Sequence, residues 1–301
     1  MRFAFASSSE ITEPIARALS SLDGFVGFIS NPDKPTGRNQ IVLPNSFSKW
    51  AQNLGFSPFK PESNTDLEKY ISNNDIQLII TCAYGKLIPS TLLNKVPLGW
   101  LNIHFSMLPK YRGAAPVQRA IINGDPKTGY SIFKMDEGLD SGPLLVTEEV
   151  VIPENIKASE LLNMLSKASS YKIVDLLADT DSWMFTKQDE NMATHAPKIS
   201  KDENRINFNQ NATEIINKSR GLDINGGVWA MFRGEKHLFS EISFAKKEVE
   251  PGEILIEDNK LFVGCKNGSI LVGEIQPAGK KTMQVTSWLN GARLQQGERF
   301  E

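Results

Sequence analysis

Short, continuous apolar runs alternate with helical periodicity through about the first 180 residues of this chain. Arg2 to Ala6, Phe25 to Ile29 and Leu78 to Ala83 have the length and apolar content of buried strands. Between them, apolar residues such as Ile15 and Leu19 recur at helical spacing. Strands that are apolar on both sides and separated by helices are typical of a mostly parallel sheet with helices on both faces. The sequence therefore predicts an α/β fold with a Rossmann-like N-terminal domain.

The character of the sequence changes after residue 184. Residues 185–203 are polar and hold only short apolar groups, as an interdomain linker does. Beyond them, one helical segment around Ile215 precedes five short alternating segments between Gly227 and Ile275, which are broken by Gly, Asn and Pro. This pattern predicts a small C-terminal β-barrel, with an OB-like barrel as one option. The predicted parts are residues 1–184, a linker at 185–203, and a barrel domain at 204–301.

Composition narrows the class of protein. The 301 residues are 40% hydrophobic and carry a formal net charge of -2, which neither demands nor excludes a nucleic-acid partner. Cys82 and Cys265 are the only cysteines and form no Cys-x-x-Cys pair, so we expect no disulfide and no metal site. The apolar stretch Phe3 to Ala6 is too short for a signal peptide, and no apolar run approaches ~18 residues. We expect a soluble cytoplasmic protein.

Three polar residues are suited to acyl transfer. Asn102 and His104 lie two residues apart at the end of the predicted strand Trp100 to His104, so both side chains point to one face. Asp140 lies in a glycine-rich loop between two further predicted strands. Ligands of such sheets bind beyond the carboxyl ends of the strands, where these residues would meet. Together they could bind an oxyanion, move a proton and orient the group that moves it.

Four sequence features resemble the formyltransferases that use 10-formyltetrahydrofolate. The first is a catalytic signature in two segments, Asn102 to Pro116 and Met135 to Pro143. The others are Asn31 to Arg38, Cys82 to Pro89, and Gln276 to Met283, in the family's order and across nearly the whole chain. Phe105, Met107 and Ser141 depart from the residues usual in the family, but none of these departures removes a reacting group.

The resemblance implies a reaction and its participants. A formyl group would pass from 10-formyltetrahydrofolate, a co-substrate, to the methionine amino group of initiator methionyl-tRNA. Asn102 would donate a hydrogen bond to the tetrahedral oxyanion, and His104 would act as a donor or proton carrier. Asp140 would accept the proton of the attacking ammonium and orient His104. A monomer without a metal is expected.

The resemblance also implies binding residues. Seven residues in two loops match positions that contact folate, and three basic residues match positions that face tRNA. The folate set is Ser106, Met107, Leu108, Pro109, Leu87, Ile88 and Pro89, and the tRNA set is Arg38, Lys280 and Lys281.

Other interpretations stay open. An N-formyltransferase for a sugar nucleotide or another small amine could share the three catalytic residues, but it leaves Arg38 without a role. A formyl-folate hydrolase would release formate without any acceptor. A dinucleotide-dependent oxidoreductase is disfavoured because no Gly-x-Gly-x-x-Gly follows the first strand. A non-catalytic RNA-binding protein would still bind tRNA after Asn102, His104 and Asp140 had been replaced.

Overall fold

The computed structural model describes residues 1–37 and 40–301, so Arg38 lies outside the described residues. Contacts divide the chain into two compact units. The first comprises Met1–Pro116, Lys127–Val151 and Leu161–Pro197, and the second comprises Val117–Pro126, Ile152–Glu160 and Lys198–Glu301.

The stretch predicted to link the domains is bonded to the first unit as far as Pro197. Thr186 exchanges two backbone hydrogen bonds with Leu144, and Arg112 exchanges backbone bonds with Thr194 and Ala196. This division therefore differs from the predicted boundaries at 184 and 203, because backbone pairing, which composition does not reveal, holds the polar stretch in place.

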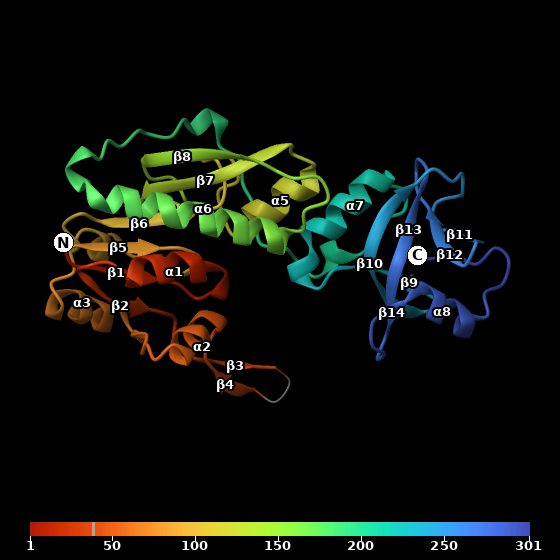
Figure 1. The fold of residues 1–301 in the computed structure, drawn as a ribbon, viewed down its shortest axis with the longest axis horizontal. Coiled ribbons are helices and arrows are strands. Elements are labelled where there is room, and N and C mark those ends of the chain that lie inside the picture. Colours follow the sequence, from red (N-terminus) through yellow and green to blue (C-terminus); the bar gives the residue numbers. More distant parts are fainter. Residues whose placement is uncertain (38–39) are drawn as a thin grey trace. The chain divides into compact units, whose positions relative to one another are not determined.

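The first unit is built on a six-stranded sheet with the order β2-β1-β5-β6-β7-β8 (Figure 1). Its strands are β1 (Phe3–Ala6), β2 (Phe25–Ile29), β5 (Leu78–Thr81), β6 (Trp100–His104), β7 (Lys127–Lys134) and β8 (Leu144–Val151). The first four are parallel to one another, whereas β7 and β8 add antiparallel pairs. The prediction of an α/β unit with a mostly parallel sheet is confirmed.

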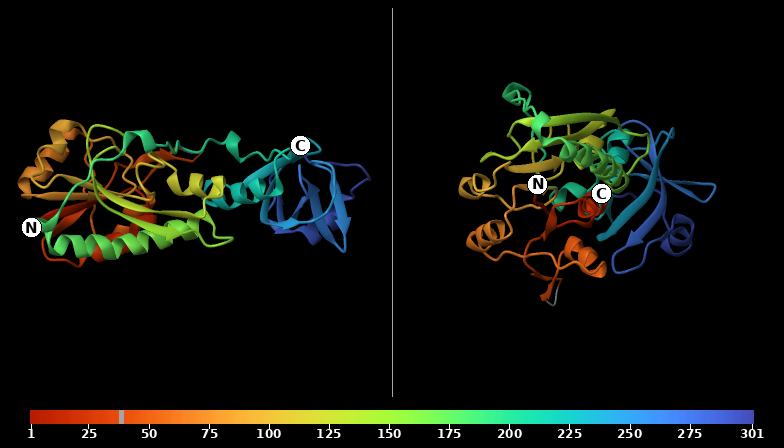
Figure 2. Two further views of the ribbon diagram at one scale, coloured as in Figure 1. Left: turned by 90° about the horizontal axis from the view of Figure 1, so that it is seen from above. Right: turned by 60° about the vertical axis from the view of Figure 1, so that its left-hand side comes forward.

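Helices cover both faces of this sheet (Figure 2). On one face, Phe5 packs edge-on against Phe28 and Phe47. On the other, Ala4 and Ala6 belong to a buried cluster that includes residues of α3 and α4. Because consecutive strand residues point to opposite faces, β1 must be apolar at every position, as its sequence is. The helices of this unit are α1 (Glu13–Ser20), α2 (Ser46–Asn53), α3 (Asn64–Asn73), α4 (Ser90–Leu93) and most of α6 (Ala158–Ala178), whereas α5 (Pro116–Asn123) belongs to the second unit from Val117 on.

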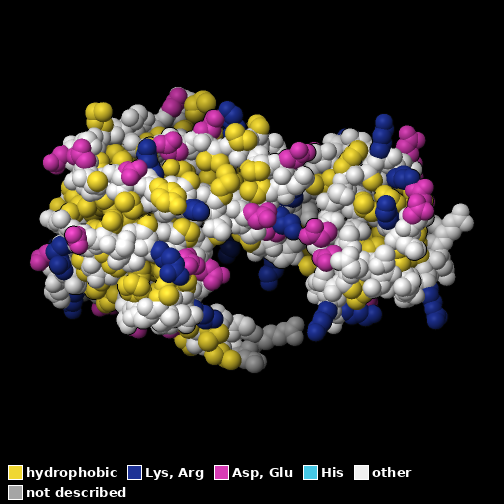
Figure 3. All heavy atoms as spheres, viewed as in Figure 1, with side chains coloured by type: hydrophobic (Ala, Val, Ile, Leu, Met, Phe, Trp, Pro, Cys, Tyr) yellow, Lys and Arg dark blue, Asp and Glu magenta, His cyan; other side chains and the backbone are white. Residues whose placement is uncertain are grey.

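A short hairpin, β3 (Lys34–Thr36) paired with β4 (Ile41–Leu43), occupies the stretch that the sequence suggests is a polar loop. Ile41 and Val42 are 55% and 61% exposed. Figure 3 shows apolar side chains of this hairpin on the molecular surface. An apolar strand that leaves its side chains in water is uncommon, and the hairpin is therefore a candidate contact surface.

The second unit holds a small antiparallel sheet with the order β11-β12-β13-β10-β9, to which β14 adds by pairing with β13. Its elements are α7 (Ala212–Gly221), β9 (Val228–Phe232), β10 (Glu235–Ala245), β11 (Ile254–Glu257), β12 (Lys260–Gly264), β13 (Ser269–Pro277), β14 (Met283–Gln284) and α8 (Val285–Ala292). All five predicted strands are present. The named strands follow an open path, so the structure confirms the antiparallel sheet but not a closed barrel.

The segment 298–301 bonds to both edges of that sheet. Met231 of β9 exchanges two backbone hydrogen bonds of 2.8 Å with Glu301. Near β11, Ile254 donates to the carbonyl of Glu298, and Phe300 donates to the carbonyl of Gly252. These bonds place the Phe300 side chain, only 2% exposed, inside the unit.

Short 3-10 turns connect several of these elements. They are Glu10–Thr12, Thr180–Ser182, Glu190–Met192, Asp202–Asn204 and Asp223–Asn225. No helix among residues 1–37 and 40–301 is both long enough and apolar enough to cross a bilayer.

Candidate active site

Asn102 and His104 project from the same face of β6, where the strand ends. Trp100 and Ile103 are buried and anchor the strand. Thr81, at the end of the neighbouring β5, donates its hydroxyl hydrogen bond to Asn102 Oδ1 at 2.8 Å. With Oδ1 engaged, the amide nitrogen of Asn102 is the group left to donate to a ligand, and it has no protein acceptor among the described residues.

The His104 ring is oriented by the loop that follows its own strand. Its Nε2 lies 2.9 Å from the carbonyl oxygen of Tyr111, and the ring is 7% exposed. A carbonyl can only accept, so Nε2 carries the hydrogen and Nδ1 of the neutral ring holds a lone pair. His104 is thereby set to take a proton at Nδ1.

Asp140 faces that lone pair. Its Oδ2 lies 3.7 Å from His104 Nδ1 and accepts a hydrogen bond of 2.8 Å from the backbone N–H of Gly113. Two acceptors do not bond to each other, which accounts for a separation longer than a hydrogen bond. Once Nδ1 takes a proton it becomes a donor, and the carboxylate then stabilises the imidazolium. The pair can therefore hold one extra proton.

The loop that carries Asp140 is tightly closed. Asp136 Oδ1 accepts from Gly138 N–H and from the Ser141 hydroxyl, at 3.0 and 2.9 Å. A side chain at Gly142 would meet the carbonyl oxygen of Lys134 at 1.8 Å, so only glycine fits there. Asp140 itself has φ +52°, a left-handed conformation that, among residues other than glycine, aspartate and asparagine tolerate best.

Serines hold the loop between β6 and α5. Ser106 donates to the carbonyl of Lys110 at 2.6 Å, and buried Ser131 of β7 donates to the carbonyl of Ser106 at 2.8 Å. Ser131 also accepts from Leu108 N–H at 3.0 Å. These bonds curl the loop so that the Tyr111 carbonyl reaches His104. Ser131 has no sequence signal of its own, because a serine in a strand is unremarkable until its neighbour across the sheet is known.

A chain of hydrogen bonds runs from exposed Glu190 through buried Arg112 and Gln188 to the Asp140 loop. The Arg112 side chain is 5% exposed and donates bidentately to Glu190. The hydrogen bonds that Arg112 donates to Glu190 raise the pKa of the guanidinium and lower the pKa of the carboxyl. Arg112 also donates to Gln188, which in turn bonds to the loop. Gln188 and Glu190 fall in the stretch predicted to be a linker, so their contribution is not foreseen from sequence.

The predicted folate residues divide into two kinds. Leu87 is 81% exposed, and Met107 and the two prolines are partly exposed. By contrast, the side chains of Ser106, Ile88 and Leu108 are 0%, 6% and 4% exposed. Ile88 belongs to the core cluster of the first unit, so its backbone alone is available to a ligand.

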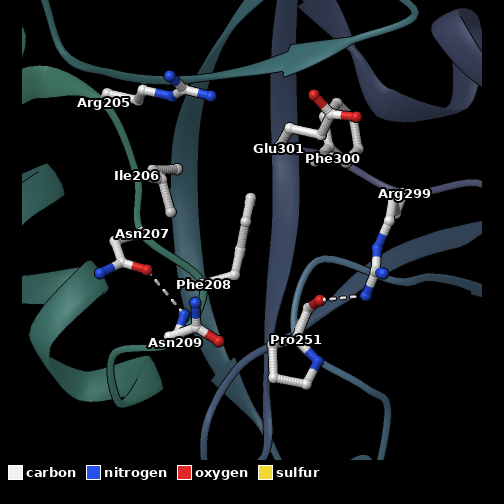
Figure 4. A pocket seen from close by; sticks show the side chains of 9 residues that line it. All are labelled: Arg205, Ile206, Asn207, Phe208, Asn209, Pro251, Arg299, Phe300 and Glu301. Carbon is white, nitrogen blue, oxygen red and sulfur yellow. Dashed lines mark hydrogen bonds between the residues drawn. The ribbon is translucent and has the colours of Figure 1, made fainter.

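The predicted tRNA lysines belong to the second unit. Lys280 and Lys281 are exposed and lie in the turn between β13 and β14. The same unit holds a cavity of about 660 Å³, lined by Arg205, Phe208, Arg299, Phe300 and their neighbours (Figure 4). In it Arg299 donates to the carbonyl of Pro251. None of the three candidate catalytic residues lines this cavity.

Comparison of the sequence with known protein families shows to which enzyme family this chain belongs. The Formyl transferase model matches residues 1–177, and the model of the Formyl transferase C-terminal domain matches residues 198–293. The chain belongs to the formyl transferase family. It is thus an enzyme that transfers a formyl group, and the Asn102, His104 and Asp140 constellation lies in the part that matches the first of these models.

Relatives of this formyltransferase are similar to it in sequence over its full length. It is 34% identical to the methionyl-tRNA formyltransferase of Dictyoglomus thermophilum, over 100% of both chains. It is 35% identical to that of Acidobacterium capsulatum, over 98% of this chain and 97% of the other. The N-formyltransferase from Helicobacter canadensis in complex with folinic acid and dTDP-3-aminofucose has a similar fold, with a TM-score of 0.65 and 16% identity over 90% and 98% of the two chains.

Proposed function

We propose that this formyltransferase moves the formyl group of 10-formyltetrahydrofolate to the methionine amino group of initiator methionyl-tRNA. The observation that carries the chemistry is the His104–Asp140 pair, separated by 3.7 Å, beside the donor amide of Asn102. The acceptor is supported by the full-length relatives named methionyl-tRNA formyltransferase. Its site of action would be the cytoplasm, where initiator tRNA is used.

The reaction proceeds by addition and elimination. The neutral amine attacks the formyl carbon, a C–N bond forms, and an oxyanion develops on the former carbonyl oxygen. Asn102 donates its free amide hydrogen to that oxyanion, an interaction worth roughly 3–4 kcal/mol in such sites. The ammonium proton passes to the pair formed by His104 and Asp140. The bond to folate N10 then breaks, and N10 receives that proton, so the products are formyl-methionyl-tRNA and tetrahydrofolate.

Folate would be bound by two loops of the first unit. Leu87 and Pro89 would offer exposed or partly exposed apolar surface to the pterin ring, while Ile88 would contribute backbone groups and Leu108 its carbonyl, since its N–H is bonded to Ser131. Ser106, Met107 and Pro109 complete the set, and the bonds from Ser131 hold their loop. Holding the two substrates together accounts for a large share of such catalysis, on the order of 7–11 kcal/mol.

An acceptor assay tests the proposed function. Purified protein with 10-formyltetrahydrofolate and charged initiator tRNA should yield formyl-methionyl-tRNA with multiple turnovers. The rival acceptor is a sugar-nucleotide amine, favoured by the shared fold with the Helicobacter canadensis enzyme. Formylation of such an amine without any formylation of the charged tRNA would replace our proposal, and release of formate without an acceptor would mark a hydrolase.

We further propose that Arg38, Lys280 and Lys281 bind the tRNA. The exposed strands β3 and β4, which flank residue 38 in the sequence, and the exposed turn between β13 and β14 support this assignment. We also propose that segment 298–301 closes the second unit as an OB-like barrel, since it bonds to both sheet edges. The corresponding domains would be residues 1–184 and 204–301, joined by 185–203, of which the part as far as Pro197 packs with the first unit.

Replacement of these three basic residues should weaken the binding of tRNA without changing the rate of formyl transfer. Arg38→Ala is expected to raise KM for charged tRNA by about tenfold, the cost of one charge-assisted hydrogen bond. Lys280→Ala with Lys281→Ala should lower the slope of log affinity against log salt by about 0.9 for each phosphate that is no longer neutralised. In both variants kcat should stay within about twofold of wild type. An unchanged KM for tRNA in either variant removes that segment from the proposed interface.

A further inference from the structure

Gln188 is a buried side chain in an exposed stretch. It is 3% exposed, whereas its immediate neighbours Lys187 and Asp189 are exposed. Its amide nitrogen donates to two backbone carbonyls of the candidate catalytic loop, those of Asp140 at 2.9 Å and Gly142 at 2.7 Å. Every polar atom of the side chain is therefore engaged, since its oxygen also accepts from Arg112.

Arg112 determines which way the Gln188 amide points. A guanidinium can only donate, and it donates to Gln188 Oε1 from both Nε and Nη2, at 3.1 and 2.7 Å. The oxygen must face Arg112, so the nitrogen must face the loop. Glu190 accepts from both Nη1 and Nη2 of Arg112 at 2.8 Å and thereby holds the guanidinium in its plane.

The loop depends on these bonds for its position. Residues 136–139 are exposed or partly exposed, and Leu139, at 55% exposure, is not a core residue of the unit. Asp140 has a left-handed backbone, which a non-glycine residue keeps only when its surroundings hold it there. Its carboxylate is held by Gly113 N–H and its carbonyl by Gln188. Removal of either hydrogen bond would free one side of the residue.

We propose that Gln188 is a positioning residue for formyl transfer: it ties the carbonyls of Asp140 and Gly142 to Arg112 and so holds the Asp140 carboxylate opposite His104. This inference rests on the proposed function and deepens it. This role needs no contact between Gln188 and a substrate, since every polar atom of its side chain is bonded to protein. It acts through Asp140, and its contribution lies in the step in which the pair takes the proton.

The substitution Gln188→Glu tests the donor function of the amide separately from its acceptor function. Glutamate keeps the size of the side chain and the acceptor for Arg112, but it cannot donate to the two carbonyls. We expect kcat to fall on the order of 100-fold, as for misplacement of a reacting group by about 1 Å. KM for folate and tRNA should stay within about threefold, because the substrate contacts are unchanged. Gln52→Glu, an equal charge change on exposed α2, should leave all three constants unaltered.

A double-mutant cycle with Asp140→Asn distinguishes positioning through Asp140 from a general structural role of Gln188. In an Asp140→Asn background, Gln188→Glu should cause little further loss of kcat, because the group that it positions is already gone. Losses that multiply would overturn the proposal, as would a Gln188→Glu variant with wild-type kcat. Were Gln188→Glu not to fold, Glu190→Gln would test the chain from its exposed end, and it should lower kcat with KM retained. An unchanged kcat in that variant would count against the proposal.

Hydrogen exchange gives a readout that does not need the reaction. Gln188→Glu should speed amide exchange in residues 136–142 and leave β6 protected as in wild type. If Gln188→Glu speeds exchange in the loop but the wild-type protein formylates no acceptor, the proposed function is overturned, while the role of Gln188 in holding the loop is retained. Loop exchange at the wild-type rate, together with normal turnover, would overturn the role of Gln188 alone.

Discussion

Replacing Asp140 with asparagine should lower kcat for formyl transfer by about 10²–10⁴, the range typical of a lost general base. Asparagine has nearly the same shape, tolerates the left-handed backbone at φ +52°, and can still accept from Gly113 N–H. It has no charge with which to stabilise a proton on His104 Nδ1. KM for folate should stay within about threefold, because the carboxylate is assigned to the transition state. Steady-state kinetics with saturating charged tRNA measures both constants.

The chain offers a matched control for that substitution. Asp75 is exposed and also adopts a left-handed backbone, with φ +49°, just before β5. Asp75→Asn makes the same chemical change in the same backbone region, outside the candidate site, and should leave kcat at the wild-type value. A rise in KM alone for Asp140→Asn would assign Asp140 to substrate binding and contradict its role in proton transfer.

Phe300→Ala should destabilise the second unit by about 3–5 kcal/mol, the usual cost of removing a buried aromatic ring. The ring is 2% exposed and lies 4.8 Å from the centroid of Phe239, 5.1 Å from that of Phe232 and 6.0 Å from that of Trp288. Such a loss of stability approaches the whole stability of a small domain. Urea unfolding followed by tryptophan fluorescence should show it, since Trp288 packs against the ring that is removed.

Phe244→Ala is the control for the truncation of Phe300. Phe244 lies in β10 of the same unit and is 56% exposed, so its removal should change the free energy of unfolding by less than about 1 kcal/mol. Equal midpoints for Phe300→Ala and wild type would mean that segment 298–301 does not hold the unit together. Retained binding of free folate in Phe300→Ala would show that the destabilisation is confined to the second unit.

The strands of the first unit could be predicted from the sequence because each is buried and locally consistent. Phe25 to Ile29 and Trp100 to His104 match β2 and β6 at both ends. The β3–β4 hairpin was not predicted, since its polar flanks and prolines suggest a loop. The links made by Ser131, Gln188 and Phe300 were missed for a different reason. Each residue acts on a partner at least 25 residues away or at another sheet edge, and a single sequence carries no record of such interactions.

The sequence by itself determined the chemical groups of the candidate site and the strand that carries two of them, because residue type and strand period are local properties. It also indicated the fold class and the family. Only the tertiary structure decided that Asp140 lies 3.7 Å from His104, that the Tyr111 carbonyl sets the His104 tautomer, and that Gln188 holds the loop. Those relations depend on how the chain between them folds back. Hydrogen bonds formed across long stretches of sequence therefore turn three suitable residues into an arrangement that can move a proton.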